Sequence, residues 1–372
     1  MSILVFNNGY LTEVPSGGDK HLLSLLPMWA GHSAVTVMLP SYAAPLVGDG
    51  PKVSSYPANP PRYLPQLVLG YLYRTFRGLG VASRTPASLV FSSPGLFDLL
   101  PALWHRRRHG SRVGVFLFHI PSPGKLEGRW MHRWVAGVAH RLSLRWLASA
   151  DCIFVGNSEV FRELAERGFD RQRLTIQPPA VDPEAILSAT PEPGPQVLFI
   201  GRLVAQKGVY DLIDVAGQLD LSFGLIGDGE LRGELKKRIR EEKLEERVQL
   251  FGGLPEARVY GLLLGCRCLI LPSYQEGYAL VVAEALIAGK PAVAYELPHY
   301  REIFGEALVT VPAGDTLALA EAVAAAVQQS AAPPWDSSRH APTPRRAAED
   351  CLAALQEPPR TPATPRQSAH HE

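Results

Sequence analysis

The chain has 372 residues, 46% of them hydrophobic and 20% charged, which is the composition of a globular protein large enough for two domains. No apolar run reaches the roughly 18–20 residues that a membrane-spanning helix needs, and the first residues lack the pattern of a signal peptide. We therefore expect a cytoplasmic protein. Because no CxxC spacing is present, we expect reduced core thiols rather than a zinc site at Cys152, Cys266, Cys268 and Cys351.

The net charge of +1 hides an uneven distribution. Residues 1–180 contain 19 Lys and Arg against 10 Asp and Glu, whereas the remainder contains 18 against 26. This basic excess predicts an anionic partner for the first half, such as a membrane surface. Nucleic acid is disfavoured, because no recognition motif accompanies the charge.

In the first half, short apolar runs typical of strands alternate with helical patterns. We expect strands at 3–6, 34–38, 89–91, 113–118 and 152–155, and helices at 19–29, 63–76, 96–109, 129–148 and 159–167. The helix at 129–148 places four arginines within about 160° of arc. Beside them runs an apolar stripe with tryptophans, so the helix either lies on a membrane surface or packs its stripe on the sheet. The arginines are Arg129, Arg133, Arg141 and Arg145, and the stripe is Met131, Val135, Val138, Leu142 and Trp146.

The second half repeats the alternation. We expect strands at 197–201, 223–226, 248–251, 268–271, 291–294 and 308–311, with helices between them that include 230–243 and 317–327. Two sets of alternating strands and helices predict two doubly wound parallel sheets. Clustered prolines predict a linker at 178–195 between domains at 1–177 and 196–330. Residues 331–372 form a Pro-rich irregular segment, with a short helix near 345–356 and a tail predicted to be disordered.

Two cations follow the first strand of the second half. Arg202 comes directly after Gly201, and Lys207 lies five residues later. Loops at the carboxyl ends of parallel strands line the ligand crevice of such sheets. An arginine there can bind phosphate oxygens with two hydrogen bonds and a lysine supplies a point charge, although a solvated surface loop would have the same sequence. The turn at 227–229, which ends at Gly229, is equally compatible with a plain turn and with a binding loop.

Two carboxylates follow the fourth strand of this half, one near its end and one in the next helical stretch. Glu276 precedes a helical stretch that is apolar apart from Glu284. Burying an unpaired carboxylate costs several kcal/mol, so we expect Glu284 to have a partner, which can be a ligand hydroxyl. The pair would suit a polyhydroxylated, phosphorylated ligand.

Three segments of the first half lie at expected strand ends. A glycine loop with Gly17 and Gly18 precedes the first helix, and His119 follows the strand at 113–118. Ser158 is a plausible N-cap for the helix at 159–167. Taken alone, the glycine loop is equally compatible with a plain turn and with a ligand site, whereas His119 and Ser158 are more often structural residues.

Together these pieces resemble the retaining, nucleotide-sugar-dependent glycosyltransferases of family four. The resemblance implies the GT-B fold, in which two doubly wound Rossmann-like domains face a central cleft. It is dense over about 150–330 and looser before. The matching motifs are Gly201-Arg202…Lys207-Gly208, Gly227-Asp228-Gly229 and Pro272-Ser273…Glu276-Gly277…Glu284-Ala285.

The resemblance also implies roles. Arg202 and Lys207 would hold the donor diphosphate, Glu284 the nucleotide ribose and Glu276 the donor sugar, while His119 would orient that sugar or assist proton movement. Backbone groups facing the donor phosphates or sugar would come from Gly17, Gly18, Gly201, Gly229, Gly277, Tyr278, Ala279 and Leu280. Ala279 departs from the family's usual glycine, and its methyl group would narrow the site.

The expected function is transfer of a hexose, with retention, from a nucleotide diphosphate sugar to a glycan or lipid-linked acceptor. No cofactor is expected, and no metal, because the second half lacks an Asp-x-Asp element. Arg202 and Lys207 would replace the metal. The alternative is a non-catalytic GT-B protein that binds sugar nucleotide or supports a partner glycosyltransferase. Phosphorolysis is disfavoured, because nothing points to a pyridoxal-phosphate lysine.

Overall fold

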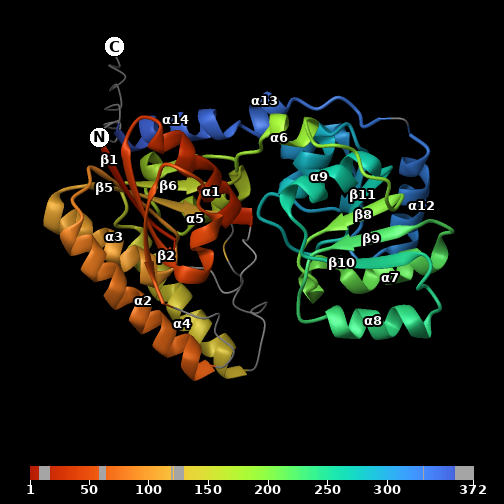
Figure 1. The fold of residues 1–372 in the computed structure, drawn as a ribbon, viewed down its shortest axis with the longest axis horizontal. Helices are drawn as coiled ribbons and strands as arrows, with labels where there is room; N and C mark the ends of the chain where they lie inside the picture. The colour runs from red at the N-terminus through yellow and green to blue at the C-terminus, as the bar shows by residue number, and fades with distance from the viewer. Residues whose placement is uncertain (8–16, 58–63, 119, 121–129, 330, 357–372) are drawn as a thin grey trace, which may run out of the picture.

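The computed structural model describes residues 1–7, 17–57, 64–118, 120, 130–329 and 331–356. These residues form two α/β domains side by side, each built on a parallel sheet (Figure 1). The first sheet has the strand order β3-β2-β1-β4-β5-β6-β7 and the second has the order β10-β9-β8-β11-β12-β13. The expectation of two doubly wound sheets is therefore confirmed.

In the first domain, two strands escape the sequence analysis because they lie at the edges of the sheet and are partly exposed, so they lack a continuous apolar run. These are the edge strands β3 (Lys52–Tyr56) and β7 (Leu174–Ile176). The other strands are β1 (Ser2–Phe6), β2 (Ala34–Pro40), β4 (Leu89–Ser92), β5 (Arg112–Leu117) and β6 (Cys152–Val155). The helices are α1 (Gly17–Ala30), α2 (Leu64–Arg84), α3 (Leu96–His109), α4 (Trp130–Leu147) and α5 (Ser158–Glu166).

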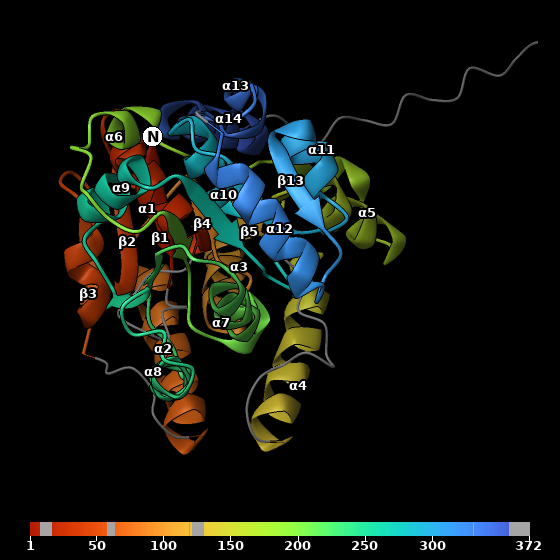
Figure 2. The same cartoon turned by 90° about the vertical axis from the view of Figure 1, so that its right-hand side faces the viewer.

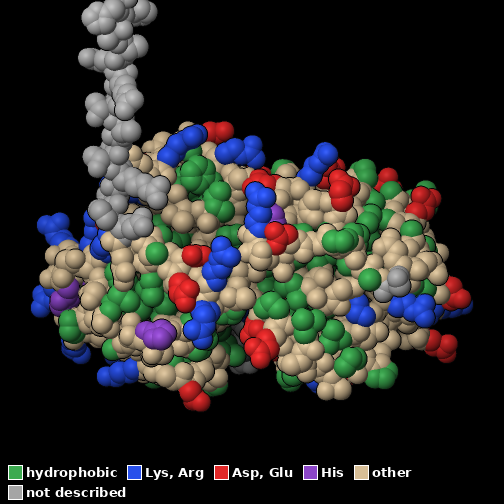
Figure 3. Space-filling view, turned by 90° about the horizontal axis from the view of Figure 1, so that it is seen from above, with side chains coloured by type: hydrophobic (Ala, Val, Ile, Leu, Met, Phe, Trp, Pro, Cys, Tyr) green, Lys and Arg blue, Asp and Glu red, His purple; other side chains and the backbone are tan. Residues whose placement is uncertain are grey.

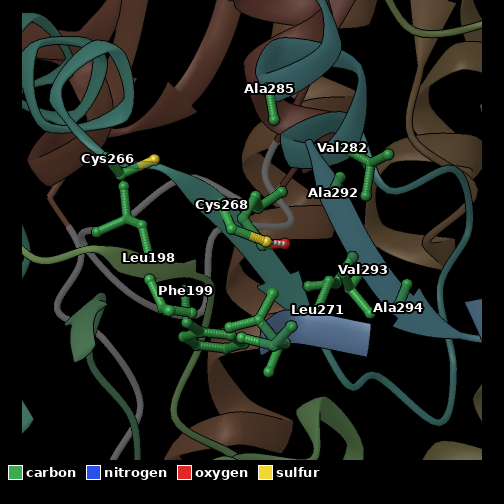
Figure 4. Packing of buried hydrophobic residues seen from close by; sticks show 14 of the residues in the cluster. Leu198, Phe199, Cys266, Cys268, Leu271, Val282, Ala285, Ala292, Val293 and Ala294 are labelled. Atoms are coloured by element: carbon green, nitrogen blue, oxygen red, sulfur yellow. Dashed lines mark hydrogen bonds between the residues drawn. The ribbon is translucent and has the colours of Figure 1, made fainter. Parts of the chain in front are cut away.

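The second domain follows the predicted order of strands and helices closely. Its strands are β8 (Val197–Ile200), β9 (Phe223–Ile226), β10 (Val248–Gly252), β11 (Cys268–Leu271), β12 (Ala292–Tyr295) and β13 (Leu308–Val311). Its helices are α7 (Val209–Gln218), α8 (Arg232–Glu241), α9 (Glu256–Gly265), α10 (Leu280–Ile287), α11 (Tyr300–Phe304) and α12 (Thr316–Val327). In Figure 4, apolar side chains of β8, β11 and β12 pack with Val282 and Ala285 of α10. All four cysteines are buried and form no disulfide. Burial raises the pKa of the Cys266 thiol to about 11.

The chain passes between the domains twice. The first passage contains the short helix α6 (Pro183–Leu187), which Asp182 caps and whose Ile186 is buried in the second domain. The second passage contains α13 (Ser337–His340) and leads to α14 (Pro344–Gln356). Helix α14 packs on α1, where the Trp29 indole N–H donates to the Ala348 carbonyl oxygen at 3.1 Å. The last described helix therefore belongs to the core of the first domain.

Two long helices of the first domain, α2 and α4, project beyond the sheets (Figure 2). Helix α2 packs on α3 so closely that a Cβ atom on Gly78 would lie 2.6 Å from the Pro101 ring. Its opposite side is exposed, with Leu69 65% and Phe76 69% accessible. Within the described part of the chain, no helix has both the length and the apolar character to cross a membrane.

Candidate functional site

The candidate site lies where loops at the carboxyl ends of β8, β9 and β11 approach the first domain. These loops pack with backbone against backbone. A Cβ atom on Gly227, whose φ is +133°, would lie 1.9 Å from the carbonyl oxygen of Gly201, and one on Gly229 would lie 2.4 Å from that of Leu203. Glycine is therefore required at this turn, and the loops that contain the predicted Gly201 and Gly229 are in direct backbone contact.

An ion pair joins the loop after β8 to the loop after β11. The Lys207 ammonium donates to Glu276 Oε1 at 2.5 Å, and the Ser273 hydroxyl donates to the same oxygen at 2.9 Å. The side chains of Lys207 and Glu276 are only 18% and 12% exposed. The pair brings together two residues that are 69 positions apart, because the carboxyl ends of β8 and β11 are adjacent in the sheet. Arg202 is exposed on the same loop as Lys207.

Helix α10 begins directly beyond this pair, at Leu280, and Ala279 occupies its N-cap position. Ala279 has φ 63° and ψ 58°, a left-handed conformation that costs a residue with a Cβ atom about 1–2 kcal/mol. Ala279 as a whole is 3% exposed and belongs to the hydrophobic core of the second domain. Its structural effect is therefore backbone strain, and the methyl group occupies buried space rather than open cleft.

The side chain of the neighbouring Tyr278 is buried in the hydrophobic core of the second domain. Its hydroxyl donates to the His340 carbonyl oxygen, and its ring lies edge-on to Phe304 at 6.0 Å between centroids. Burial raises the pKa of the Tyr278 phenol. Because the phenol is engaged in packing and a hydrogen bond to α13, only the backbone of Tyr278 is available to a ligand.

Glu284 lies one turn into α10 and is 6% exposed. Burial raises the pKa of its carboxyl group to about 7, although Lys20 of the first domain and a hydrogen bond with Tyr260 partly oppose that effect. Glu256 raises the pKa further through charge repulsion. Glu284 is therefore the costly buried carboxylate that the sequence predicts, and a neighbouring tyrosine and a lysine of the first domain partly stabilise it.

The first domain meets this site through the start of α1. The sequence analysis expects Gly17 in a loop before the first helix, but the structure places it in the first turn of α1. A Cβ atom on Gly17 would lie 3.3 Å from the Leu280 side chain, so the start of α1 and the start of α10 face each other directly. Gly18 is the next residue of α1. Lys20 forms an ion pair with Glu256 at 3.7 Å, both partners being more than a third exposed. The predicted His119 lies outside the described residues.

The helix-cap prediction for Ser158 is wrong by one residue. The side chain of Asn157 accepts the Val160 N–H at 2.9 Å, whereas Ser158 is the first residue of α5 and its hydroxyl donates to Glu302 of the second domain. Asn157 has extended backbone angles, φ −156° and ψ 172°, which are those of a cap residue. Both residue types are good caps, so composition alone does not distinguish them.

One buried histidine, His21, was not singled out by the sequence analysis. Its Nδ1 accepts the backbone N–H of Ala180 at 2.8 Å, and its ring packs edge-on to Phe116 and Phe118. Burial lowers its pKa to about 3, so the ring stays neutral at physiological pH. The histidine joins α1 to the first passage between the domains.

Comparisons with known proteins agree with this geometry. Residues 186–341 match the family model described as glycosyl transferases group 1. The chain is 27% identical over 205 residues to the 2-deoxystreptamine glucosyltransferase of Streptomyces kanamyceticus, which covers 50% of this chain and 51% of that protein. It is 30% identical over 347 residues to the phosphatidyl-myo-inositol mannosyltransferase of Mycobacterium leprae, which covers 85% of each.

Among solved structures, Anabaena HepE in complex with UDP and glucose has a TM-score of 0.69 at 16% identity, with 95% of this chain and 97% of that chain covered. This likeness confirms the GT-B fold. The alignment with the Streptomyces kanamyceticus enzyme spans only about half of that relative's length, 51%.

Proposed function

The chain belongs to the group 1 glycosyl transferases, and from this premise we propose that it transfers a hexose from a nucleotide diphosphate sugar to a glycan or lipid-linked acceptor. We further propose that the anomeric configuration is retained and that no metal takes part. The Lys207–Glu276 pair carries the proposal, because it places a cation and a carboxylate together, mostly buried, beside the start of a helix. Phosphate and sugar hydroxyls need groups of these two kinds.

The charges of the proposed reaction explain the arrangement. Cleavage of a glycosyl–phosphate bond builds negative charge on the leaving diphosphate, which Arg202 and Lys207 would stabilise. One such preorganised donor contributes roughly 10²–10³ in rate. When Lys207 turns to the diphosphate, Glu276 loses its ion-pair partner and becomes available to the hydroxyls of the donor sugar. Donor binding would thus replace the Lys207–Glu276 ion pair by contacts of each residue with the donor.

Glu284 is proposed to bind the ribose hydroxyls. It is buried and its pKa is raised to about 7, so both its protonated and its ionised form are populated near neutral pH. Hydroxyl donors favour the ionised form of a carboxyl group. Nucleotide binding should therefore lower the pKa of Glu284 and release a fraction of a proton near neutral pH.

A lipid-linked acceptor is supported by the exposed face of α2. The exposed apolar side chains of this helix fall within about 140° of arc, at 100° per residue. The exposed cations Arg77 and Arg84 lie along one edge of the stripe, a pattern that favours an anionic membrane surface. The stripe is Val68, Leu69, Leu72, Tyr73 and Phe76.

Helix α4 supports the same surface. Two members of its predicted apolar stripe, Leu142 and Trp146, are 44% and 46% exposed, so they do not pack on the sheet, and Arg141 and Arg145 are exposed beside them. By contrast, the face that carries α13 and α14 shows acidic and basic side chains interspersed over both domains (Figure 3). The phosphatidyl-myo-inositol acceptor named for the Mycobacterium leprae relative also supports a lipid acceptor.

A thermal-shift panel tests the donor site. UDP, GDP, ADP and their sugar conjugates are added in EDTA to the wild type and to Lys207→Ala. A ligand at 100 times its dissociation constant should add about 2.7 kcal/mol of stability. Stabilisation of the wild type alone supports a metal-independent diphosphate site, whereas no shift with any nucleotide refutes the donor site. Binding without hydrolysis of the matching sugar nucleotide would instead favour the non-catalytic alternative.

A further inference from the structure

The N-terminus of α5 reaches from the first domain to the second. Three consecutive residues each contact a different residue there, and two of these contacts are 2.6 and 2.7 Å long. The contacts join Asn157 to the Gly277 carbonyl oxygen, Ser158 to the Glu302 carboxylate and Glu159 to the His299 ring. A single helix end thus holds both the loop before α10 and the helix α11.

Both the oxygen and the nitrogen of the Asn157 side-chain amide form hydrogen bonds. Its oxygen accepts the Val160 N–H at 2.9 Å, which caps α5, and its nitrogen donates to the Gly277 carbonyl oxygen at 2.6 Å. The side chain is 3% exposed. Because the cap needs the oxygen, the NH₂ group must face Gly277, and a reversed amide would set two oxygens against each other.

The hydrogen bond from Asn157 to the Gly277 carbonyl oxygen fixes the orientation of the peptide group between Gly277 and Tyr278. In a trans peptide the C=O and the following N–H point in opposite directions, and the described residues contain no cis peptide bond. Asn157 therefore directs the Tyr278 N–H away from α5. This N–H lies two residues after Glu276 and two before the first residue of α10, which is the stretch proposed to face the donor.

We propose that Asn157 is a positioning residue, which orients the Tyr278 N–H toward the donor across the boundary between the domains. The inference rests on the proposed function. We call residues 276–279, which lie just before α10, the donor loop. Since Asn157 and Gly277 belong to different domains, this loop keeps its hydrogen bond from Asn157 only while the domains are in contact. Loss of that contact would leave the loop, including the strained Ala279, without its hydrogen bond from the first domain.

Two substitutions separate this contact from the helix cap. Asn157→Asp and Asn157→Ser both keep an oxygen that can cap α5. The aspartate carboxylate has no hydrogen to donate to Gly277, and the serine hydroxyl ends one bond short of the position of the amide nitrogen. Asp315→Ala is the matched control, because it removes the cap of α12, where Asp315 accepts the Ala318 N–H at 2.9 Å, away from this contact.

Hydrogen exchange of the ligand-free proteins gives the first readout. Loss of one hydrogen bond predicts exchange about fivefold faster for the amides of residues 278–283 in both Asn157 variants, and no such local change in Asp315→Ala. Turnover gives the second readout. With the donor that the nucleotide panel identifies, kcat should fall about ten- to a hundredfold, while KM changes less.

Several outcomes would overturn the proposal. Unchanged exchange in both Asn157 variants means that the contact does not hold the loop, and an equal rise in Asp315→Ala means that general stability controls it. Faster exchange with unchanged kcat removes the positioning role. Failure of the wild type to bind any nucleotide refutes the proposed function instead, and the exchange comparison still decides whether Asn157 holds the loop.

Discussion

Replacing Glu284 by glutamine should stabilise the empty protein and at the same time impair nucleotide binding. Burial raises the pKa of this carboxyl group from 4.5 to about 7. An acid whose pKa is higher in the folded than in the unfolded state loses stability as the pH rises from the lower value to the higher. At about 1.4 kcal/mol per pKa unit, the penalty for ionised Glu284 reaches about 3 kcal/mol above pH 7.

The assay is urea unfolding of the wild type and Glu284→Gln at pH 5 and pH 8. Glutamine keeps the shape of glutamic acid but does not ionise, so the variant should be about 3 kcal/mol more stable at pH 8. At pH 5 the advantage should shrink to below about 1 kcal/mol, because the folded carboxyl group keeps its proton there and pH 5 lies only about half a unit above the unfolded pKa of 4.5. The variant should also lose most of the stabilisation by the nucleotide that stabilises the wild type.

Glu276→Gln is the control, because Glu276 accepts an ion pair from Lys207 and a hydrogen bond from Ser273. Removing its charge should destabilise the empty protein, the opposite sign. A Glu284→Gln variant no more stable than the wild type at pH 8 would refute the argument from burial. A gain of equal size at both pH values would show that it does not come from ionisation.

Three further predictions concern the cations, the membrane face and the donor loop. Lys207→Ala should leave Glu276 without its ion-pair partner and cost about 1–3 kcal/mol in urea unfolding, and it should lower kcat by roughly 10²-fold or more in a donor-transfer assay. Equal activity would contradict the role of Lys207 in stabilising the diphosphate. The double variant Leu69→Ser with Phe76→Ser should bind anionic vesicles about tenfold more weakly or worse in co-sedimentation, whereas Leu317→Ser, which alters a leucine 62% exposed on α12, should not. Replacement of Asn157 should speed exchange in the donor loop as described above.

The sequence predicts the second domain better than the first, for a physical reason. Central strands such as β9 and β11 are apolar on both faces and stand out as continuous runs, so their bounds agree with the structure. Edge strand β3 reads Lys-Val-Ser-Ser-Tyr and is mostly exposed, so it lacks that signal. Helix α14 is predicted as a helix, but its return to the first domain is not visible in its own composition.

Some contacts of the candidate site can be predicted from the sequence, and others cannot. The pairing of Lys207 with Glu276 is accessible to sequence reasoning, because both residues follow strands that are adjacent in a doubly wound sheet. The contact of Asn157 with Gly277 is not, since it depends on how two separate sheets face each other. The left-handed conformation of Ala279 was equally hidden, because alanine carries no signal for positive φ.

The return of α14 affects how the protein is made. Trp29 is buried against the Ala348 carbonyl, and Cys351 and Leu355 complete the core of the first domain. On the ribosome, the first sheet emerges roughly 180 residues before the helix that covers this face, which at about 5–20 residues per second is a delay of about 10–40 s. During this time the nascent chain exposes an apolar surface around Trp29. Translation must therefore reach the end of α14 before the first domain can fold completely, and a chain shortened before Pro344 would keep that surface open to aggregation or chaperone binding.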